Sequence, residues 1–525
     1  MAFSNVKISF HGVVFTVLVA FLVFMTLGAM VATLVWSGDR PSLFSQYELT
    51  VMLFTLKQAI LSSILSCCLA IPISRALFRQ NFFLKEHIIR LLGLPFILPV
   101  ISAVFGLILL FGNSGLLNSF FLMVGLPKLS IYGMSGILIA HVFFNLPLAI
   151  RLLLLAWKDI PNEQFKIGSA LGFNNNAFFY HLELPMLRGI LPGLLLLIFL
   201  ICITSFSIAL TLGGGPNSTT IEVAIYQALR FQLDFTKAAS LACSQFILCS
   251  LVAFLLLLIS KGSSSFQALD FNVKSYNSSY FRKNLLDYIW IFMVCSFLLS
   301  PLLLLIFEGV RGLISLQYDI YLAALNSFFL SITSGFLGVV MALIISTWVG
   351  ASKFKLSTKY IEILSIFILA SSPIVMGTGI FLIVKPLISF EYLTPVLVIL
   401  VNATMSLPFM LRCLVPAVAA VEKDLGKLAD SLSIIGLSRL RNVIIPRVLP
   451  ALGFCFGIGA ALSMGDLGVI TLFSFGEFQT LPLAIYRLMI SYRFDQAFSA
   501  SILLVVICFF LFQVFDSLGK HYALR

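Results

Sequence analysis

Apolar residues in this chain form twelve long blocks that are separated by polar segments. A helix needs about 20 mostly apolar residues to cross a bilayer, and each block approaches or exceeds that length. The pattern predicts an all-α polytopic membrane protein with about 12 transmembrane helices. The first six predicted spans are Gly12–Trp36, Leu49–Ile73, Ile88–Gly112, Ile131–Trp157, Gly189–Leu212 and Lys237–Ile259. The last six are Leu286–Phe307, Tyr321–Val349, Ile361–Val384, Leu393–Ala417, Val448–Phe473 and Gln496–Leu518.

The composition excludes most soluble classes of protein. Of the 525 residues, 60% are hydrophobic and 10% are charged, whereas a soluble domain carries about 25% charged residues. This excludes a water-soluble enzyme, a disordered chain and a collagen-like fibre. The nine cysteines lie in or at the ends of apolar blocks without Cys-x-x-Cys spacing, so we interpret them as packing residues.

The basic residues predict the orientation of the chain, because Lys and Arg are enriched in cytoplasmic loops. With the N-terminus inside, 24 of the 33 Lys and Arg residues fall in inner segments and 8 in outer segments. We therefore expect both termini to be cytoplasmic. The net charge of +12 then reflects membrane topology, and we expect no nucleic-acid partner.

A Ser- and Asn-rich stretch, Lys261–Asn284, divides six predicted spans from the other six. Its composition is typical of a linker. We therefore expect a first half at residues 1–260, a cytoplasmic linker at 261–285 and a second half at 286–525.

The two halves repeat one another at an offset of 260 or 261 residues. Each half has an even number of spans, so both halves have the same orientation. This predicts a pseudo-two-fold axis along the membrane normal, with a pathway between the halves. The matched pairs are Leu146-Pro147 and Leu407-Pro408, Leu171 and Leu432, Leu184-Pro185 and Ile445-Pro446, and Ile225-Tyr226 and Ile485-Tyr486.

Two inner loops are longer than the other connections, at about 30 residues each, and both contain helical periodicity. They begin near Lys158 and Ala420, and each pattern predicts two short helices with a break, then a proline before the next span. Such helices can bind the groove of a partner, or they can lie in the membrane interface and only join two spans. The same design in both halves favours a two-fold partner.

Motifs of catalysis and nucleotide binding are missing from the sequence. It contains no Gly-x-x-x-x-Gly-Lys-Ser/Thr loop, no His-Glu-x-x-His motif and no Gly-x-Ser-x-Gly with a plausible triad. We therefore expect no catalytic residue, metal or cofactor in this chain. Transport driven by a separate ATPase would agree with these absences.

The first long loop resembles the signature of ABC importer permeases, a cytoplasmic motif of the form EAA-x3-G-x9-I-x-LP. Gly172 matches the glycine, Leu182 the isoleucine and Leu184-Pro185 the final pair. The EAA positions depart from the motif, since they fall on Lys166, Ile167 and Gly168.

The second loop resembles the same signature with the same spacing. Val443 matches the isoleucine and Ile445-Pro446 the final pair, whereas Ser433 replaces the glycine and Lys427–Ala429 occupy the EAA positions. The resemblance implies a type I ABC importer permease in a bacterial inner (plasma) membrane, with one ATPase subunit on each loop. Those two ABC ATPase subunits would hold the ATP and magnesium.

The residues that the resemblance implies for ATPase docking come from both loops. In the first loop they are Glu163, Lys166, Ser169, Ala170, Leu171, Gly172, Leu182 and Pro185. In the second loop they are Asp424, Lys427, Ala429, Ser431, Leu432, Ser433, Val443 and Pro446.

The fused six-plus-six arrangement is similar to the permeases of thiamine and ferric-iron importers, and the segment from Ser205 is especially similar to the thiamine permeases. Its glycines permit a sharp turn at the outer mouth. The residues after that turn predict an amphipathic outer helix that could receive a periplasmic substrate-binding protein, or an ordinary connecting loop. The candidate contact residues are Gly213, Gly214, Gly215, Pro216, Glu222 and Tyr226.

Two charged residues inside predicted spans are candidates for the pathway. Asp466 lies near Gly465 and Gly468 and could face a cationic substrate, or it could make a hydrogen bond between helices. Lys57 could mark the pathway, or its side chain could reach the membrane interface.

The resemblance implies a permease that moves thiamine or thiamine phosphates into the cytoplasm by alternating access. The same machinery with ferric iron or a polyamine as cargo is an alternative. A twelve-span secondary transporter, which would need coupling-ion groups and no ATPase, is an alternative from a different class.

Overall fold

The computed structural model describes residues 2–36, 45–259, 285–351, 355–386, 390–474 and 478–523. The expected linker Lys261–Asn284 lies outside these residues. Helices make up most of the described ranges, which contain no β-strand. This agrees with the predicted all-α class, because a helix satisfies all of its backbone hydrogen bonds within one segment of a membrane.

The helices that precede the expected linker include five of 20 or more residues and several shorter ones. They are α1 (Ala2–Trp36), α2 (Gln46–Arg79), α3 (Lys85–Leu91), α4 (Val100–Phe111), α5 (Leu116–Met123), α6 (Met134–Lys158), α7 (Asn162–Ala170), α8 (Asn175–Phe178), α9 (Leu184–Ile203), α10 (Phe206–Leu212), α11 (Ile221–Gln227) and α12 (Phe235–Ile259). Shorter turns of helix are η1 (Leu94–Phe96), η2 (Phe179–Glu183), η3 (Pro216–Ser218) and η4 (Ala228–Gln232).

The helices that follow the expected linker have a similar order. They are α13 (Leu285–Arg311), α14 (Tyr318–Ala351), α15 (Lys355–Ala370), α16 (Pro373–Val384), α17 (Phe390–Ser431), α18 (Leu437–Arg439), α19 (Ile445–Met464), α20 (Gly468–Phe473), α21 (Leu481–Ile490) and α22 (Phe494–Ala523). The shorter turns are η6 (Leu313–Ser315) and η7 (Leu440–Ile444).

The number of predicted spans is confirmed. Among the described residues, eleven helices or continuous helical stretches are long and apolar enough to cross a membrane. Helices α15 and α16 make a twelfth span if they are counted together, although the chain bends by 82° between them. Pro373 begins α16 at this bend, and proline cannot continue the hydrogen-bond ladder of a preceding helix.

The boundaries of the third predicted span, Ile88–Gly112, are wrong. Helix α3 ends at Leu91 and α4 begins at Val100, so the candidate span runs from Val100 to Met123 instead. Pro95 and Pro99 lie in the interruption. Because these two prolines lack a backbone N–H group, a continuous helix is unfavourable in this stretch.

Spans five and eleven are also interrupted, at corresponding places in the two halves. Helix α9 ends at Ile203 before α10, and α19 ends at Met464 before α20. The predicted spans Gly189–Leu212 and Val448–Phe473 therefore each consist of a long and a short helix. As a result, Asp466 lies in a break between helices and not within one.

The two halves exchange their first helices. Helix α1 packs against α14 and α16 of the second half, and α13 packs against α4 and α2 of the first half. At each of these two interfaces a glycine permits the exchanged helix to approach closely. A Cβ atom at Gly106 of α4 would lie 2.7 Å from the carbonyl oxygen of Pro301, and one at Gly379 of α16 would lie 2.5 Å from Cβ of Thr26.

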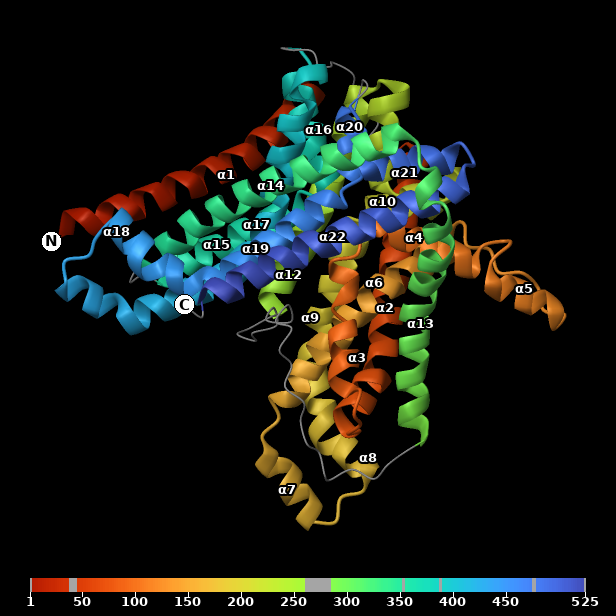
Figure 1. The fold of residues 1–525 in the computed structure, drawn as a ribbon, viewed down its shortest axis with the longest axis horizontal. Helices are drawn as coiled ribbons and strands as arrows, with labels where there is room; N and C mark the ends of the chain where they lie inside the picture. The colour runs from red at the N-terminus through yellow and green to blue at the C-terminus, as the bar shows by residue number, and fades with distance from the viewer. Residues whose placement is uncertain are drawn as a thin grey trace.

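The molecule has two arms that meet at one end (Figure 1). Helices α7 and α8 lie at the tip of one arm and α18 near the tip of the other, far from each other. Helices α4, α10, α20 and α21 lie near one another at the opposite end, which we call the joined end. One buried apolar cluster contains residues of both halves, including Phe105, Tyr226 and Phe473. The fold thus places the two long loops at separated tips.

Candidate functional site

The two long loops have the same order of structure, displaced by 261 residues. The π-helical turns η2 and η7 are five residues long, and each leads directly into the next long helix, α9 or α19. Pro185 and Pro446 are the second residues of those helices, and because proline has no N–H, each leaves a carbonyl of the preceding turn without its helical donor. The repeat seen in the sequence therefore corresponds to a repeat in the backbone.

The expectation of two separate short helices holds for the first loop but is wrong for the second. In the first loop, α6 ends at Lys158 and α7 is a separate helix that follows Pro161. In the second loop, the corresponding segment is the end of α17, which continues to Ser431. Glu422 stands where the first half has Pro161. Pro161 has an extended backbone and stands directly before α7, whereas Glu422 lies within α17. Proline lacks the N–H that would continue α6 at this point.

Both loop helices end in the same hydrogen-bonded cap. The N–H of Phe173 donates to the Gly168 carbonyl at 2.9 Å, and the N–H of Ile434 donates to the Ala429 carbonyl at the same distance. This bond across six residues, with a left-handed residue before its donor, defines a Schellman cap. The chain therefore turns sharply after each loop helix.

Each loop helix exposes an apolar pair at its tip. Ile167 and Leu171 are 59% and 68% exposed, and Leu428 and Leu432 are 56% and 62% exposed. The members of each pair are four residues apart, so they lie on one face of the helix. Sequence reasoning counted Leu171 and Leu432 among the docking residues, but it noted Ile167 and Leu428 only as EAA positions of the motif.

The other predicted docking residues differ in exposure. Glu163, Lys166, Ser169, Ala170, Gly172 and Pro185 are exposed in the first loop, as are Asp424, Lys427, Ser431, Ser433 and Pro446 in the second. Leu182 and Val443 are half-buried. Ala429 is buried, so it supports the loop helix from below and is not available for direct contact with a partner.

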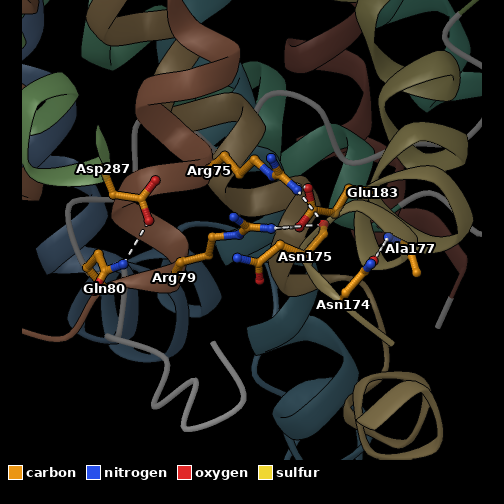
Figure 2. A network of polar contacts seen from close by, with 8 residues as sticks. All are labelled: Arg75, Arg79, Gln80, Asn174, Asn175, Ala177, Glu183 and Asp287. Carbon is orange, nitrogen blue, oxygen red and sulfur yellow. Dashed lines mark hydrogen bonds and ion pairs between the residues drawn. The ribbon is translucent and has the colours of Figure 1, made fainter. Parts of the chain in front are cut away.

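Buried ion pairs attach the first loop to α2 (Figure 2). Arg75 Nε lies 2.5 Å from Glu183 Oε2, and Arg79 Nη2 lies 3.5 Å from Glu183 Oε1. Arg75 and Arg79 also donate to the backbone carbonyl of Asn175, at 3.0 and 3.5 Å. Since the Glu183 carboxylate is fully buried, its two arginine partners are needed to offset the cost of its desolvation.

Two further hydrogen bonds order this region (Figure 2). The Asn174 side chain accepts from the N–H of Ala177 at 2.8 Å and caps α8. Gln80 Nε2 donates to Asp287 Oδ2 at 2.7 Å, which joins the end of α2 to the start of the exchanged helix α13. The first loop is thus held against the end of α2, which is itself joined to α13.

Ion pairs also brace the second loop, but the acidic and basic residues have exchanged positions. Arg439 at the end of α18 donates to both carboxylate oxygens of Glu422, at 3.0 and 2.5 Å, and to Asp430 Oδ1 at 2.6 Å. Both acids belong to α17. In the first loop the acid, Glu183, directly precedes the next span, and its arginine partners lie on an earlier helix. In the second loop the base, Arg439, lies near the next span, and its acidic partners lie on the earlier helix. The position of the brace is similar, but its chemistry is not repeated.

Sequence reasoning missed these brace residues. Arg75 and Arg79 are four residues apart at the end of an apolar span, and Glu183 lies directly before Leu184-Pro185. A charged residue at such a place is costly unless it is paired. That cost is the signal that could have identified Glu183, although its partner cannot be deduced from local spacing.

The two pathway candidates belong to different halves. Asp466 is half-buried and accepts from the N–H groups of Gly468 at 3.1 Å and Val469 at 3.2 Å, so it caps α20. Lys57 lies on the exposed face of α2. Capping gives Asp466 a structural role that the sequence did not suggest.

The candidate binding-protein contact is only partly on the surface. Gly214 and Gly215 are exposed and have positive φ angles of +69° and +128°, as expected for the sharp turn. Gly213 is buried, and Pro216 begins η3. The expectation that Glu222 and Tyr226 lie on a contact surface is wrong for this structure. Gln245 donates to the fully buried Glu222 at 2.7 Å, and Tyr226 is 8% exposed.

No protein-family model matches the chain, but known proteins resemble it along nearly its whole length. It is 35% identical to the thiamine transport system permease protein ThiP of Brucella abortus (strain 2308), over 95% of this chain and 93% of that protein. It is 35% identical to ThiP of Escherichia coli (strain K12), over 89% and 88%. ThiP of Haemophilus influenzae is 32% identical, over 94% of both chains.

A more distant relative corresponds to a smaller part of the chain. The molybdenum transport system permease protein ModB of Azotobacter vinelandii is 27% identical over 40% of this chain, which is 94% of its own length. The relatives that align along nearly the whole chain all have one name. This chain belongs to the family of thiamine transport system permease proteins.

Proposed function

We propose that this chain is the membrane-spanning subunit of an ATP-driven importer that moves thiamine or thiamine phosphates into a bacterial cell. The names of the full-length relatives support the cargo. The single observation that carries the importer class is the repeat of the two loops, each with an exposed apolar pair at the tip of a separate arm. One identical partner could bind at each tip.

The partners in this proposal are two copies of an ABC ATPase subunit. Ile167 with Leu171, and Leu428 with Leu432, would enter the same apolar groove on each copy. The ATP and its magnesium belong to those subunits, and this chain carries no catalytic residue in the proposal. The ion pairs of Glu183 and Arg439 would hold the two loops rigidly, so that a movement of the ATPase subunits reaches the arms.

The orientation follows from the charges of the loops. We place the tips of the arms and both termini in the cytoplasm, since the inner segments carry 24 of the 33 Lys and Arg residues. The joined end then faces the periplasm, where a substrate-binding protein would deliver the cargo. The exposed turn at Gly214 and Gly215 is the part of the candidate contact that such a protein could reach.

Transport would proceed by alternating access. In the described conformation the arms are separated at the tips and meet at the joined end. Approach of the tips to each other would separate the joined end and admit the cargo between the halves. Thiamine carries a positive charge, so the Asp466 carboxylate is our candidate for a charged contact in the pathway. Lys57 is the weaker candidate, because its exposed side chain can also reach the interface.

Reconstitution in lipid vesicles tests this function. We expect vesicles that contain the permease and its ATPase to accumulate thiamine only when ATP and the binding protein are present. Uptake of ferric iron or a polyamine in place of thiamine would contradict the cargo. Uptake that needs an ion gradient and persists without ATP would contradict the importer class and identify a secondary transporter.

A further inference from the structure

A hydrogen bond from Arg230 connects the two halves at the joined end, where Ser102 Oγ of α4 also donates to the Ser501 carbonyl of α22 at 3.1 Å. Arg230 lies in the π-helical turn η4, directly after α11 of the first half. Its Nη2 donates to the backbone carbonyl of Ser474, in the second half, at 2.8 Å. Ser474 is the residue that follows the last residue of α20, so the guanidinium lies at the carbonyl end of that short helix, where a positive charge is favourable.

The end of α20 receives a second donor from its own half. Thr394 Oγ1 donates to the Phe473 carbonyl at 2.8 Å. Two successive carbonyls at the end of α20 therefore accept one bond from each half of the protein. Of these two bonds, only the one from Arg230 crosses between the halves.

Tyr226 lies close to Arg230. The Tyr226 ring packs edge-on against Phe206 and Phe231, with ring centroids 5.5 and 5.6 Å apart. Burial raises the pKa of Tyr226, and the positive charge of Arg230 acts in the opposite direction. The guanidinium thus has a packed phenol of its own half nearby and donates to a backbone carbonyl of the other half.

The repeated residues of the second half lie close to this contact. Tyr486 on α21 corresponds to Tyr226 and interacts with it electrostatically, and Arg487 interacts with both Tyr226 and Arg230. Arg230 and Arg487 belong to opposite halves and repel each other. The joined end therefore contains both an attraction between the halves, the Arg230 bond, and a repulsion, between Arg230 and Arg487.

We propose that Arg230 is a latch that holds the joined end closed and that must release Ser474 for cargo to enter. The inference rests on the proposed importer function. A hydrogen bond from a charged donor is stronger than a neutral one, so it favours the closed joined end. The positive charge of Arg487 repels Arg230 and so reduces the stability of the closed joined end. The ATPase subunits can therefore open this end with a limited part of their binding energy.

The test measures ATP hydrolysis by the permease–ATPase complex in vesicles, with and without a thiamine-loaded binding protein. In wild type we expect low hydrolysis without the binding protein and stimulation with it. We expect Arg230→Gln to raise the unstimulated rate at least about threefold, because it loses a charged hydrogen bond that is present only in the closed state. Thiamine uptake per ATP should fall.

Three further variants separate the latch from general damage. Arg230→Lys keeps a charged donor and should lie between wild type and Arg230→Gln. Tyr226→Phe keeps the ring packing, loses only the hydroxyl that lies close to Arg230, and should give a smaller rise. Arg487→Gln is the matched control, since it also removes a positive charge from this end, and its unstimulated rate should not rise.

The outcomes distinguish the latch from the importer function. An unstimulated rate equal to that of wild type in both Arg230→Gln and Tyr226→Phe overturns the latch, while a stimulated wild type leaves the importer function intact. An equal rise in Arg487→Gln also overturns the latch, because loss of any charge would then be sufficient. A wild-type complex that the binding protein does not stimulate contradicts the importer function and the latch together.

Discussion

Gly172 and Ser433 have the same left-handed backbone conformation, with φ angles of +73° and +56°. They occupy matching positions in the two long loops, directly before the donor of each Schellman bond. Glycine adopts this conformation at little cost, whereas a residue with a Cβ atom is strained in it. The second loop therefore keeps the conformation of the first without the glycine, because the cap and the turn that follows require it.

This relationship predicts opposite effects of two substitutions. A Cβ atom at Gly172 would meet no atom within 4 Å, so the cost of Gly172→Val is confined to the backbone, at about 1–2 kcal/mol. We expect this variant to reach the membrane normally but to retain less ATPase in co-purification. Ser433→Gly should relieve strain and retain at least as much ATPase as wild type. Weaker retention by Ser433→Gly than by Gly172→Val would contradict this account of the cap.

The exposed apolar pairs predict a docking defect without loss of stability. Leu171→Glu and Leu432→Glu each place a charge where we propose an apolar groove, and both positions are more than half exposed. We expect each variant to reduce ATPase co-purification, and the two together to abolish it, with unchanged thermal unfolding. Ile314→Glu, at another highly exposed apolar position, is the control and should bind the ATPase normally.

The buried brace of the first loop predicts a large loss of stability. Glu183→Ala removes the buried carboxylate that Arg75 and Arg79 share, and breaking such a pair costs about 3–5 kcal/mol. Glu308→Ala removes the acid of an exposed pair with Arg311, which should cost about 0–1 kcal/mol. Thermal unfolding of the two purified variants compares the costs. Equal unfolding temperatures would show that the Glu183 pair does not stabilise the loop.

The exchange of first helices predicts two sites that are sensitive to added volume. Gly106→Val and Gly379→Val insert side chains where a Cβ atom alone would lie within 3 Å of the exchanged helix. Overpacking of this kind costs about 1–3 kcal/mol. Gly28→Val on α1 is the matched control, because nothing lies within 4 Å of its Cβ position. The unfolding temperature should be lower than that of wild type in Gly106→Val and Gly379→Val but not in Gly28→Val.

Asp466→Asn separates the two roles of Asp466. Asparagine is as good a helix cap as aspartate, so α20 should stay capped and the protein should fold normally. Loss of the negative charge should raise the KM for thiamine uptake if the carboxylate faces the cation in the pathway. An unchanged KM in a normally folded variant would leave Asp466 with its capping role alone.

Local sequence was sufficient to predict part of the loops. The proline at residue 185, its counterpart at 446 and the spacing of Leu171 and Leu432 all follow from patterns within about 30 residues. The continuity of α17 through Glu422 could also have been inferred, because only the first half has a proline at that position. By contrast, Glu183 and its arginines are more than 100 residues apart, and no local pattern specifies such a pair.

The helical class, the number of spans and the repeat between the halves follow from the amino-acid sequence alone. These properties depend on how many apolar residues follow one another and on spacing along the chain, which are local quantities. By contrast, the exchange of α1 and α13, the burial of Glu222 and the bond from Arg230 to Ser474 are seen only in the folded structure. Those contacts join residues that are distant along the chain. They form because helices can pack closely only where a glycine leaves room, and because the carbonyls at a helix end need donors from elsewhere in the fold.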